Sequence, residues 1–240
     1  MQDSEFRIEY KYYVPLMVRP YLLDDLQKFT FLDSHIQKKE GCYYIASVYF
    51  ENYEFKNYFE KIEGDPRRQK LRLRFYKPLE KNQWVNIELK HKIFDRCFKE
   101  KIKIEDSIFK NLYSSSFAEM DYNSSDPILK KFIITVKKDN LYPFIRIDYK
   151  RKAFFASCDS KVRITFDFEV KCAPFLREIK QEPYIPVLTE DMGILEIKTP
   201  CYFPFWLSEI IKKYNLKRTA VSKYLLSVQN LMVNSFFDNF

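Results

Sequence analysis

The chain has 240 residues, of which 46% are hydrophobic and 18% are aromatic, a composition that excludes a disordered protein and allows an extensive core. Its 41 lysine and arginine residues outnumber the 33 aspartate and glutamate residues, and the formal net charge is +8. This excess favours anionic partners, whether nucleotides, polyphosphate, nucleic acid or an anionic membrane surface.

Residue counts exclude several kinds of site. The chain has only three glycines, so it has no glycine-rich phosphate-binding loop and must bind any phosphate with side chains. Two histidines argue against a Ser-His-Asp triad and against a histidine-rich metal site. The five scattered cysteines form no CxxC pair and indicate buried thiols in a reducing compartment. Because we find neither a signal peptide nor a long uncharged apolar segment, we expect a soluble, cytoplasmic protein.

Hydrophobic periodicity predicts a mixture of strands and helices along the whole chain. Strands are expected at residues 6–14, 42–51, 70–76, 84–92, 97–104, 143–155, 161–171 and 193–199. Helices are expected at residues 18–29, 53–62, 106–113, 128–138, 204–214 and 220–232, and a loop with three prolines precedes the last strand. No repeat or linker interrupts this order, so we expect one domain over residues 1–240.

The segment 70–76 shows the clearest alternation. Leu71, Leu73 and Phe75 fall on one side of a strand, because successive side chains of a strand point to opposite faces. The other side carries Lys70, Arg72, Arg74 and Tyr76. The planar guanidinium group of arginine matches phosphate oxygens in a bidentate manner, so this face is a candidate phosphate-binding surface. The alternative is a strand with a solvated outer face, which is common in antiparallel sheets.

Five further predicted strands repeat this pattern with a largely basic polar face. These faces carry Arg7, Glu9 and Lys11; Glu88, Lys90 and Lys92; Lys99, Lys101 and Lys103; Arg163, Thr165, Asp167, Glu169 and Lys171; and Glu196 and Lys198. If the strands close into a barrel with this face inward, the lumen becomes a polyanion site and the helices cover the apolar outside. In the strand at residues 143–155, the pattern leaves open whether Tyr149 and Arg151 face inward. The set that alternates with them is Arg146, Asp148, Lys150 and Lys152.

Short motifs in these segments follow one another in a distinctive order. They are Arg7-Ile8-Glu9-Tyr10-Lys11-Tyr12, Ser47-Val48-Tyr49-Phe50, Leu71-Arg72-Leu73-Arg74-Phe75-Tyr76, Glu88-Leu89-Lys90, Lys99-Glu100-Lys101, Tyr149-Lys150-Arg151, Val162-Arg163-Ile164-Thr165-Phe166-Asp167, Leu195-Glu196-Ile197-Lys198 and Ser222-Lys223-Tyr224. Each motif alone is weak, but the ordered set is specific and covers most of the chain. It resembles the catalytic domain of the vacuolar transporter chaperone complex, a polyphosphate polymerase of the triphosphate tunnel metalloenzyme superfamily.

The resemblance implies an α+β fold, in which an antiparallel β-barrel forms a tunnel and helices pack around its outside. It implies that the triphosphate of ATP is held by basic residues that also serve catalysis, namely Lys11, Arg72, Arg74, Lys90, Lys99, Arg151, Arg163 and Lys223. It adds phosphate contacts from Tyr149, Lys198 and Ser222, and a contact from Glu196 to Mn²⁺ or Mg²⁺. The alternative for Glu196 is a salt bridge to a neighbouring base, and for Ser222 a place on a helix face. Asp167 and Glu169 are expected to balance neighbouring basic residues.

The reaction that the resemblance implies is an attack by the terminal phosphate of a growing polyphosphate chain on the γ-phosphorus of ATP, with release of ADP. The expected partners are ATP or triphosphate and polyphosphate, with no nucleic acid, and a separate membrane protein is a further candidate partner. The chain departs from the pattern at Arg7, Glu100 and Ala220, where a glutamate, a basic residue and a lysine are expected. Two alternatives stay open: a metal-dependent triphosphatase on the same scaffold, and a non-catalytic polyanion-binding module.

Overall fold

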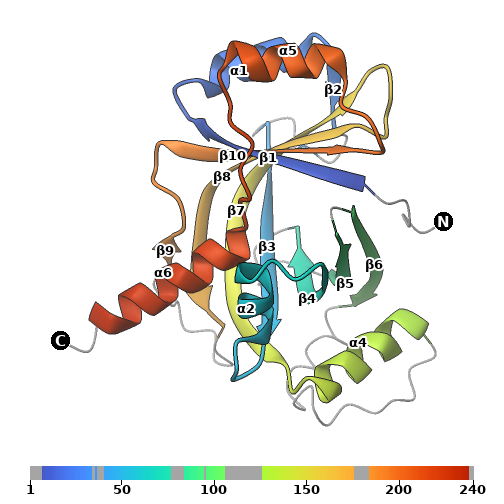
Figure 1. The fold of residues 1–240 in the computed structure, drawn as a ribbon, viewed down its shortest axis with the longest axis vertical. Helices are drawn as coiled ribbons and strands as arrows, with labels where there is room; N and C mark the ends of the chain where they lie inside the picture. Colours follow the sequence, from blue (N-terminus) through green and yellow to red (C-terminus); the bar gives the residue numbers. More distant parts are fainter. Residues whose placement is uncertain are drawn as a thin grey trace.

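In the part of the chain that the structure describes, eight antiparallel strands form a sheet that closes into a ring, because the first and the last of these strands, β7 and β8, also pair with each other (Figure 1). In order around the ring they are β7 (Tyr142–Ala156), β3 (Tyr43–Glu51), β4 (Arg67–Phe75), β5 (Trp84–Ile93), β6 (Arg96–Glu105), β1 (Arg7–Pro15), β10 (Met192–Thr199) and β8 (Arg163–Pro174). Two short strands extend the sheet, β2 (Thr30–Leu32) beside β7 and β9 (Ile185–Pro186) beside β8. The predicted antiparallel barrel is confirmed.

This computed structural model describes residues 7–33, 36, 41–76, 84–94, 96–105, 126–175 and 184–237. Within them the helices are α1 (Arg19–Gln27), α2 (Lys56–Ile62), α4 (Pro127–Lys138), α5 (Phe205–Lys213) and α6 (Lys223–Phe237). The helix predicted at residues 106–113 lies outside the described residues. The other predicted elements are present with shifted boundaries, so the α+β class is confirmed.

Strand β4 shows how a period of two separates the charges from the core. Leu71, Leu73 and Phe75 are each at most 1% exposed and pack in an apolar cluster between the ring and α4. Arg72 and Arg74 point the other way and line the interior of the ring. The alternation predicted for this strand is therefore confirmed, with the charged face inward.

Helices cover the apolar outer faces, as the pattern predicts. In Figure 1, α1 and α5 lie together across one end of the ring, and they pack on outward-facing residues of β8 and β10 such as Phe166 and Leu195. On another side, α4 packs against β3, β4 and β5. The start of α4 is fixed by Asp126, whose carboxylate accepts hydrogen bonds from the backbone amides of Ile128 (2.8 Å) and Leu129 (3.0 Å).

Helix α6 fills the part of the interior of the ring that is not lined by charged residues. Its residues Tyr224, Val228 and Leu231 pack against inward-facing aliphatic residues of β3 and β7, including Ile45 and Ile147. Tyr58 of α2 joins the same cluster. The lumen is thus divided into an apolar section beneath α6 and a charged section beside it.

The ring is closed unevenly. Strands β5 and β6 pair along their whole length. Among the described residues, β6 and β1 pair only through Arg7 with Cys97 and Ile8 with Arg96. This β6–β1 seam is the shortest pairing in the ring, so other interactions must help to hold the barrel closed there.

The predicted alternation fails in the second half of β8. Glu169 has a positive φ of 52°, and the register between β7 and β8 shifts by one residue at this point. The resulting bulge turns Val170 into the interior, where it is 3% exposed, and places Glu169 and Lys171 outside. The prediction that these two residues share the inward face with Asp167 is wrong. Glu169 instead forms an ion pair with Lys150 at 2.8 Å, on the outer side of the ring.

Pairing with β3 and β8 settles the direction of β7, which the sequence left open. Tyr149 and Arg151 line the lumen. Asp148 lies on the outer face and is fully buried, and both of its carboxylate oxygens accept hydrogen bonds from Arg146, at 2.9 and 2.8 Å. Arg146 and Asp148 therefore balance each other on the outer face, and neither lines the lumen.

Gly193 in β10 lies too close to a buried ring to tolerate a side chain. A Cβ atom at this position would overlap the ring of Phe166 and would lie 3.1 Å from the carbonyl oxygen of Asp167. Because Phe166 is fully buried and cannot move aside, we expect Gly193→Ala to lower the free energy of unfolding by about 1–3 kcal/mol, the usual effect of overpacking. Chemical denaturation measures this change. The double variant Gly193→Ala/Phe166→Leu should lose less than the sum of the two single variants, and strict additivity would contradict the clash.

Candidate functional site

Two adjoining cavities lie inside the ring, with volumes of about 480 and 80 Å³. Both are lined by Glu9, Arg72, Arg74, Lys90, Cys97, Arg151 and Lys198. The larger is lined further by Lys11, Tyr49, Lys61, Arg68, Lys70, Lys92, Tyr149, Glu196, Arg218 and residues 219–224. The smaller is lined further by Arg7, Tyr43, Tyr76, Phe98, Lys99 and Arg163. Because they share lining residues, the two cavities form one lumen with a common middle.

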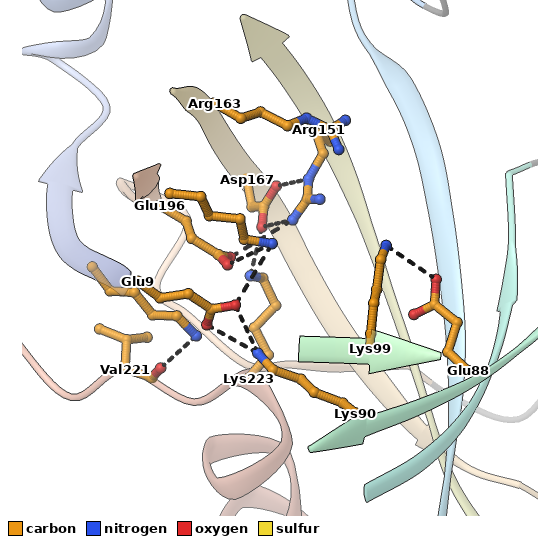
Figure 2. Close-up of polar contacts among 12 residues, drawn as sticks. Glu9, Glu88, Lys90, Lys99, Arg151, Arg163, Asp167, Glu196, Val221 and Lys223 are labelled. Atoms are coloured by element: carbon orange, nitrogen blue, oxygen red, sulfur yellow. Dashed lines mark hydrogen bonds and ion pairs between the residues drawn. The ribbon is translucent and has the colours of Figure 1, made fainter. Parts of the chain in front are cut away.

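Positive charge dominates the larger cavity, since twelve of its lining residues are lysine or arginine and two are glutamate. Cations this close repel one another strongly in a low-dielectric interior unless anions lie among them. Figure 2 shows the carboxylates that do so, with basic side chains directed toward them from several strands. They are Glu9, Glu88, Asp167 and Glu196, and we call them the lumen carboxylates.

Glu88 on β5 fixes the paired arginines of β4. One of its oxygens accepts from Arg72 at 2.5 Å, and the other lies 3.8 Å from Arg74. Burial alone would raise the pKa of this 1% exposed carboxyl group, but Arg72 and Arg74 hold the pKa well below its usual range. The hydroxyls of Tyr49 and Tyr149 accept from Arg72 (3.2 Å) and Arg74 (3.4 Å). Both guanidinium groups are therefore oriented before any ligand binds.

Glu9 links its own strand, β1, to β5, the strand on the far side of β6. Both of its oxygens lie 2.9 Å from the Lys90 ammonium group, and Lys198 lies 3.7 Å from one of them. Lys198 also lies 3.2 Å from Glu196. Burial alone would raise the pKa of Glu9, but Lys90 and Lys198 lower it to about 2. Ion pairs of Glu9 thus help to hold the ring closed near the β6–β1 seam, where few backbone hydrogen bonds join the strands.

Asp167 on β8 binds two basic residues at once. Its oxygens accept from Arg151 in a bidentate pair, at 2.6 and 2.8 Å, and it lies 2.5 Å from the Lys223 ammonium group. Arg151 also lies 3.9 Å from Glu196. Although burial opposes ionisation, Arg151 and Lys223 lower the pKa of Asp167. Asp167 therefore balances neighbouring basic residues, as the sequence predicted.

Residues 217–222 carry the last part of the site to the lumen. This segment runs beside β1 in space. The backbone amide of Thr219 donates a hydrogen bond to the backbone carbonyl of Lys11 at 2.9 Å. Ser222 lines the larger cavity, and its hydroxyl accepts from the amide of Leu225 at 3.3 Å. Ser222 therefore caps the start of α6 while it faces the lumen.

Lys99 and Arg163 line only the smaller cavity. Arg163 donates to Asp33 at 2.8 Å and to the hydroxyl of Tyr43 at 3.3 Å, and Lys99 lies 3.9 Å from Glu88. All the predicted site residues thus line the lumen, although their roles stay predictions. The other ten are Lys11, Arg72, Arg74, Lys90, Tyr149, Arg151, Glu196, Lys198, Ser222 and Lys223, in the larger cavity.

Some cavity residues are not among the predicted site residues. They are the acidic residue Glu9 and the basic residues Arg7, Lys61, Arg68, Lys70, Lys92 and Arg218. Alternation in the sequence signals four of these residues, which lie on the charged faces of their strands: Arg7, Glu9, Lys70 and Lys92. Lys61 lies on α2, and no periodic pattern predicts that this helix brings it to the lumen.

The residues of the lumen fit a divalent cation that binds together with phosphate. Among the described residues, no group of three or more histidine, cysteine, aspartate or glutamate side chains is arranged to hold a metal ion. Mg²⁺ and similar hard cations commonly bind through one or two carboxylates and the phosphates of a substrate. Glu9 and Glu196, which share Lys198 as a partner, can supply such a pair of carboxylates.

The closed ring and its cation-lined lumen define a tunnel protein for phosphate-rich anions. The family model of the VTC domain matches residues 6–232, so the chain belongs to this family, and the resemblance found in the sequence is confirmed. The family places it among tunnel enzymes that bind triphosphate or polyphosphate. No curated protein sequence matches the chain.

Solved structures resemble this chain at low sequence identity. A Bacillus halodurans protein proposed to be an adenylate cyclase is 13% identical, with a TM-score of 0.58 over 91% of this chain and 95% of that one. At this identity the likeness supports the fold alone. The PH1819 protein of Pyrococcus horikoshii OT3 is 12% identical, with a TM-score of 0.46 over 95% of this chain and 99% of its own. None of the helices in the described part of the chain has the length and apolar character needed to cross a membrane.

Lys70 makes the stability of the protein depend on pH. Its ammonium group lies 4.0 Å from the centre of the Tyr224 ring and has no hydrogen-bond partner among the described residues. Burial lowers the pKa of Lys70 to about 7; Glu51 opposes this shift, and Arg68 and Lys61 add to it. Between about pH 7 and about pH 8.5 the unfolded chain therefore binds more protons at this position than the folded protein, and stability should rise by on the order of 1 kcal/mol.

Chemical denaturation at both pH values tests this expectation, with Lys70→Met as the comparison. The variant should lose the contribution of Lys70 to the rise and keep that of Lys99, whose pKa burial also lowers to about 7. An identical pH response in the two proteins would show that Lys70 stays charged throughout.

Proposed function

We propose that this protein extends polyphosphate by transferring the γ-phosphate of ATP to the end of a growing chain inside the lumen. The observation that carries the proposal is the set of oriented guanidinium and ammonium groups around one cavity inside the ring. Membership of the VTC domain family supports it. Phosphoryl transfer depends mainly on positioning and on neutralised charge, with little covalent chemistry from the protein.

The chemistry follows from the residues in the middle of the lumen. Arg72 and Arg74 from β4 and Arg151 from β7 line both cavities, and their guanidinium groups would bind non-bridging phosphate oxygens. An oxygen of the terminal phosphate of the chain would form a bond to the γ-phosphorus while the bond from that phosphorus to the β–γ bridging oxygen breaks. The electron pair leaves with ADP, so the transfer itself requires no proton from the protein.

Phosphate oxygens would replace the lumen carboxylates as partners of the same cations. Lys198 lies between Glu9 and Glu196, at 3.7 and 3.2 Å, and is thus held where an incoming anion can exchange with either carboxylate. Such an exchange keeps each buried cation paired in both the empty and the bound state. Fixed charges in an enclosed cavity also stabilise the transition state more strongly than the same charges in water.

Glu196 and Glu9 would hold Mn²⁺ or Mg²⁺ together with phosphate oxygens. When bound, the cation would neutralise charge on the phosphoryl oxygens. This role needs an ionised carboxylate. Burial alone would raise the pKa of Glu196, but Lys198 and Lys11 hold the pKa well below its usual range, so the ligand is ready at neutral pH.

Incubation of the pure protein with ATP and Mn²⁺ tests the proposal. A polymerase releases ADP in proportion to the phosphate that enters long-chain polyphosphate. A triphosphatase on the same scaffold uses water and releases orthophosphate, and a polyanion-binding module leaves ATP intact. Gel separation of polymer and chromatography of ADP and orthophosphate, with and without Mn²⁺, distinguish these outcomes. Release of ADP with orthophosphate and no polymer would contradict the proposal.

Arg74→Ala tests the phosphate contact. Arg74 is 6% exposed, and loss of one charge-assisted hydrogen bond should weaken triphosphate binding by about 1.5–3 kcal/mol, or roughly tenfold to hundredfold, and should lower turnover. Calorimetric titration measures the affinity. Arg67→Ala is the matched control, because Arg67 lies on the same strand, is exposed and lines neither cavity. Normal triphosphate binding by a folded Arg74→Ala protein would remove this residue from the site.

Glu196→Gln separates binding from turnover. The variant keeps the shape of the side chain but removes one negative charge from the lumen, so metal-free triphosphate binding should be equal or tighter. Metal-dependent turnover should fall sharply, because the anionic ligand is lost. Glu169→Gln, on the outside of β8, is the control. Full metal-dependent activity in a folded Glu196→Gln protein would show that this carboxylate only pairs with neighbouring bases.

A further inference from the structure

Strand β2 has an open edge. In the described part of the chain it pairs with β7 along one edge and with no strand along the other. The backbone amide of Asp33, directly after β2, donates to the carbonyl of Ala153 of β7 at 2.9 Å. Backbone groups of successive residues in a strand point to opposite edges, so Thr30 and Leu32 direct their N–H and C=O groups away from β7. Such an edge is a template for a further strand.

Large apolar side chains surround this open edge. Phe31 is 51% exposed and stacks on Phe155 of β7, with the ring centres 5.9 Å apart. Phe29 stacks on Trp206 of α5 at 4.9 Å, and β2 and α5 lie at the same end of the ring in Figure 1. We call the exposed side chains of this surface the β2 patch: Phe29, Phe31, Leu32 and Phe205.

The β2 patch is large enough to form the apolar part of a protein interface. Its four side chains are 42–78% exposed. At about 150–250 Å² for each complete side chain, they present on the order of 400 Å² of apolar surface. One side of a stable protein interface covers about 800 Å², of which a little over half is apolar. The patch therefore supplies most of the apolar area that one side of such an interface needs.

The charges beside the patch favour a second copy of the chain as the partner. With a net charge of +8, two copies repel each other, so an interface between them must lie where the surface carries little charge. All four members of the β2 patch are uncharged. Arg163, which lies over the ring of Phe155, donates to Asp33 at 2.8 Å, and Lys28 lies 2.8 Å from Asp25. These two basic residues keep their carboxylate partners when the patch is covered.

We propose that two copies of this chain associate through their β2 patches, with the two β2 strands paired antiparallel about a two-fold axis at Phe31. In this register Thr30 of each copy lies opposite Leu32 of the other, and the two pairs would form four backbone hydrogen bonds. The two Phe31 side chains would meet on the axis and join the two Phe155 rings in one row. The same edge serves both copies, as a two-fold interface requires. The proposed activity does not enter this inference.

Sedimentation equilibrium of the full chain over a range of concentrations tests the association. The 29.3 kDa chain should approach twice this mass at high concentration and should dissociate on dilution. Phe31→Lys places two ammonium groups opposite each other on the axis, so the dissociation constant should rise by at least about tenfold. Ile134→Lys is the matched control, because Ile134 is a 43% exposed residue of α4 outside the β2 patch. Its dissociation constant should equal that of the unmodified chain.

A charge-swap experiment separates loss of the contact from loss of the fold. Phe31→Glu alone should also be monomeric, because it places two carboxylates on the axis. A mixture of the Phe31→Lys and Phe31→Glu proteins should form a mixed dimer, because opposite charges then face each other. Higher salt should weaken this mixed dimer, because it screens the attraction. Higher salt should strengthen the unmodified dimer, because there it screens the repulsion between two cationic chains.

Three results would overturn the inference. The first is an unmodified chain that stays monomeric at every concentration, which would mean that something other than a second copy covers the patch. The second is an unchanged dissociation constant in a folded Phe31→Lys protein, which would place the contact between copies elsewhere. The third is a mixture of folded Phe31→Lys and Phe31→Glu proteins that stays monomeric, which would exclude a two-fold axis at this residue.

Discussion

The structure depends on a few buried carboxylates that keep a crowded set of cations inside a closed ring. An unpaired guanidinium or ammonium group in this interior would be strongly unfavourable, because the surroundings cannot solvate it as water does. Glu88, Glu9 and Asp167 each accept from at least one basic residue at 2.9 Å or less, so each acidic side chain stabilises the fold and also orients a cation. The same ion pairs therefore account for the stability of the empty lumen and for its readiness to receive an anion.

The backbone makes this arrangement possible by sorting side chains residue by residue. On β4, one face supplies the lumen and the other packs under a helix, as Arg72 and Leu73 show. Closure of the ring then brings together faces that lie far apart in the sequence. Only part of the interior is charged. In the rest of it, apolar side chains of α6 such as Val228 and Leu231 pack against the inward faces of β3 and β7.

Much of this could be predicted from the sequence, because a period of two determines which face of a strand a residue occupies. The period does not determine which distant residue a side chain will contact. The hydrogen bond from Arg163 to Asp33 therefore could not be predicted from the sequence. The bulge at Glu169 was missed because a residue other than glycine at positive φ gives no warning in the sequence. Strands β2 and β9 are too short to show a period. The approach of Lys61 depends on how α2 packs, which is a tertiary property.

The first strand of the ring and the last third of the chain meet in the lumen, and this has a consequence for how the protein is made. The Lys11 ammonium group donates to the carbonyl of Val221 at 3.2 Å, across 210 residues of sequence. Contacts between residues so distant in the sequence form late and slow the folding of a chain. During synthesis, the basic faces of β1, β4 and β5 leave the ribosome long before β8, β10 and α6 bring Asp167, Glu196 and Lys223 to them. Until then those faces lack part of their final charge balance, so their lysine and arginine side chains are open to capture by the anionic polymers of the cell.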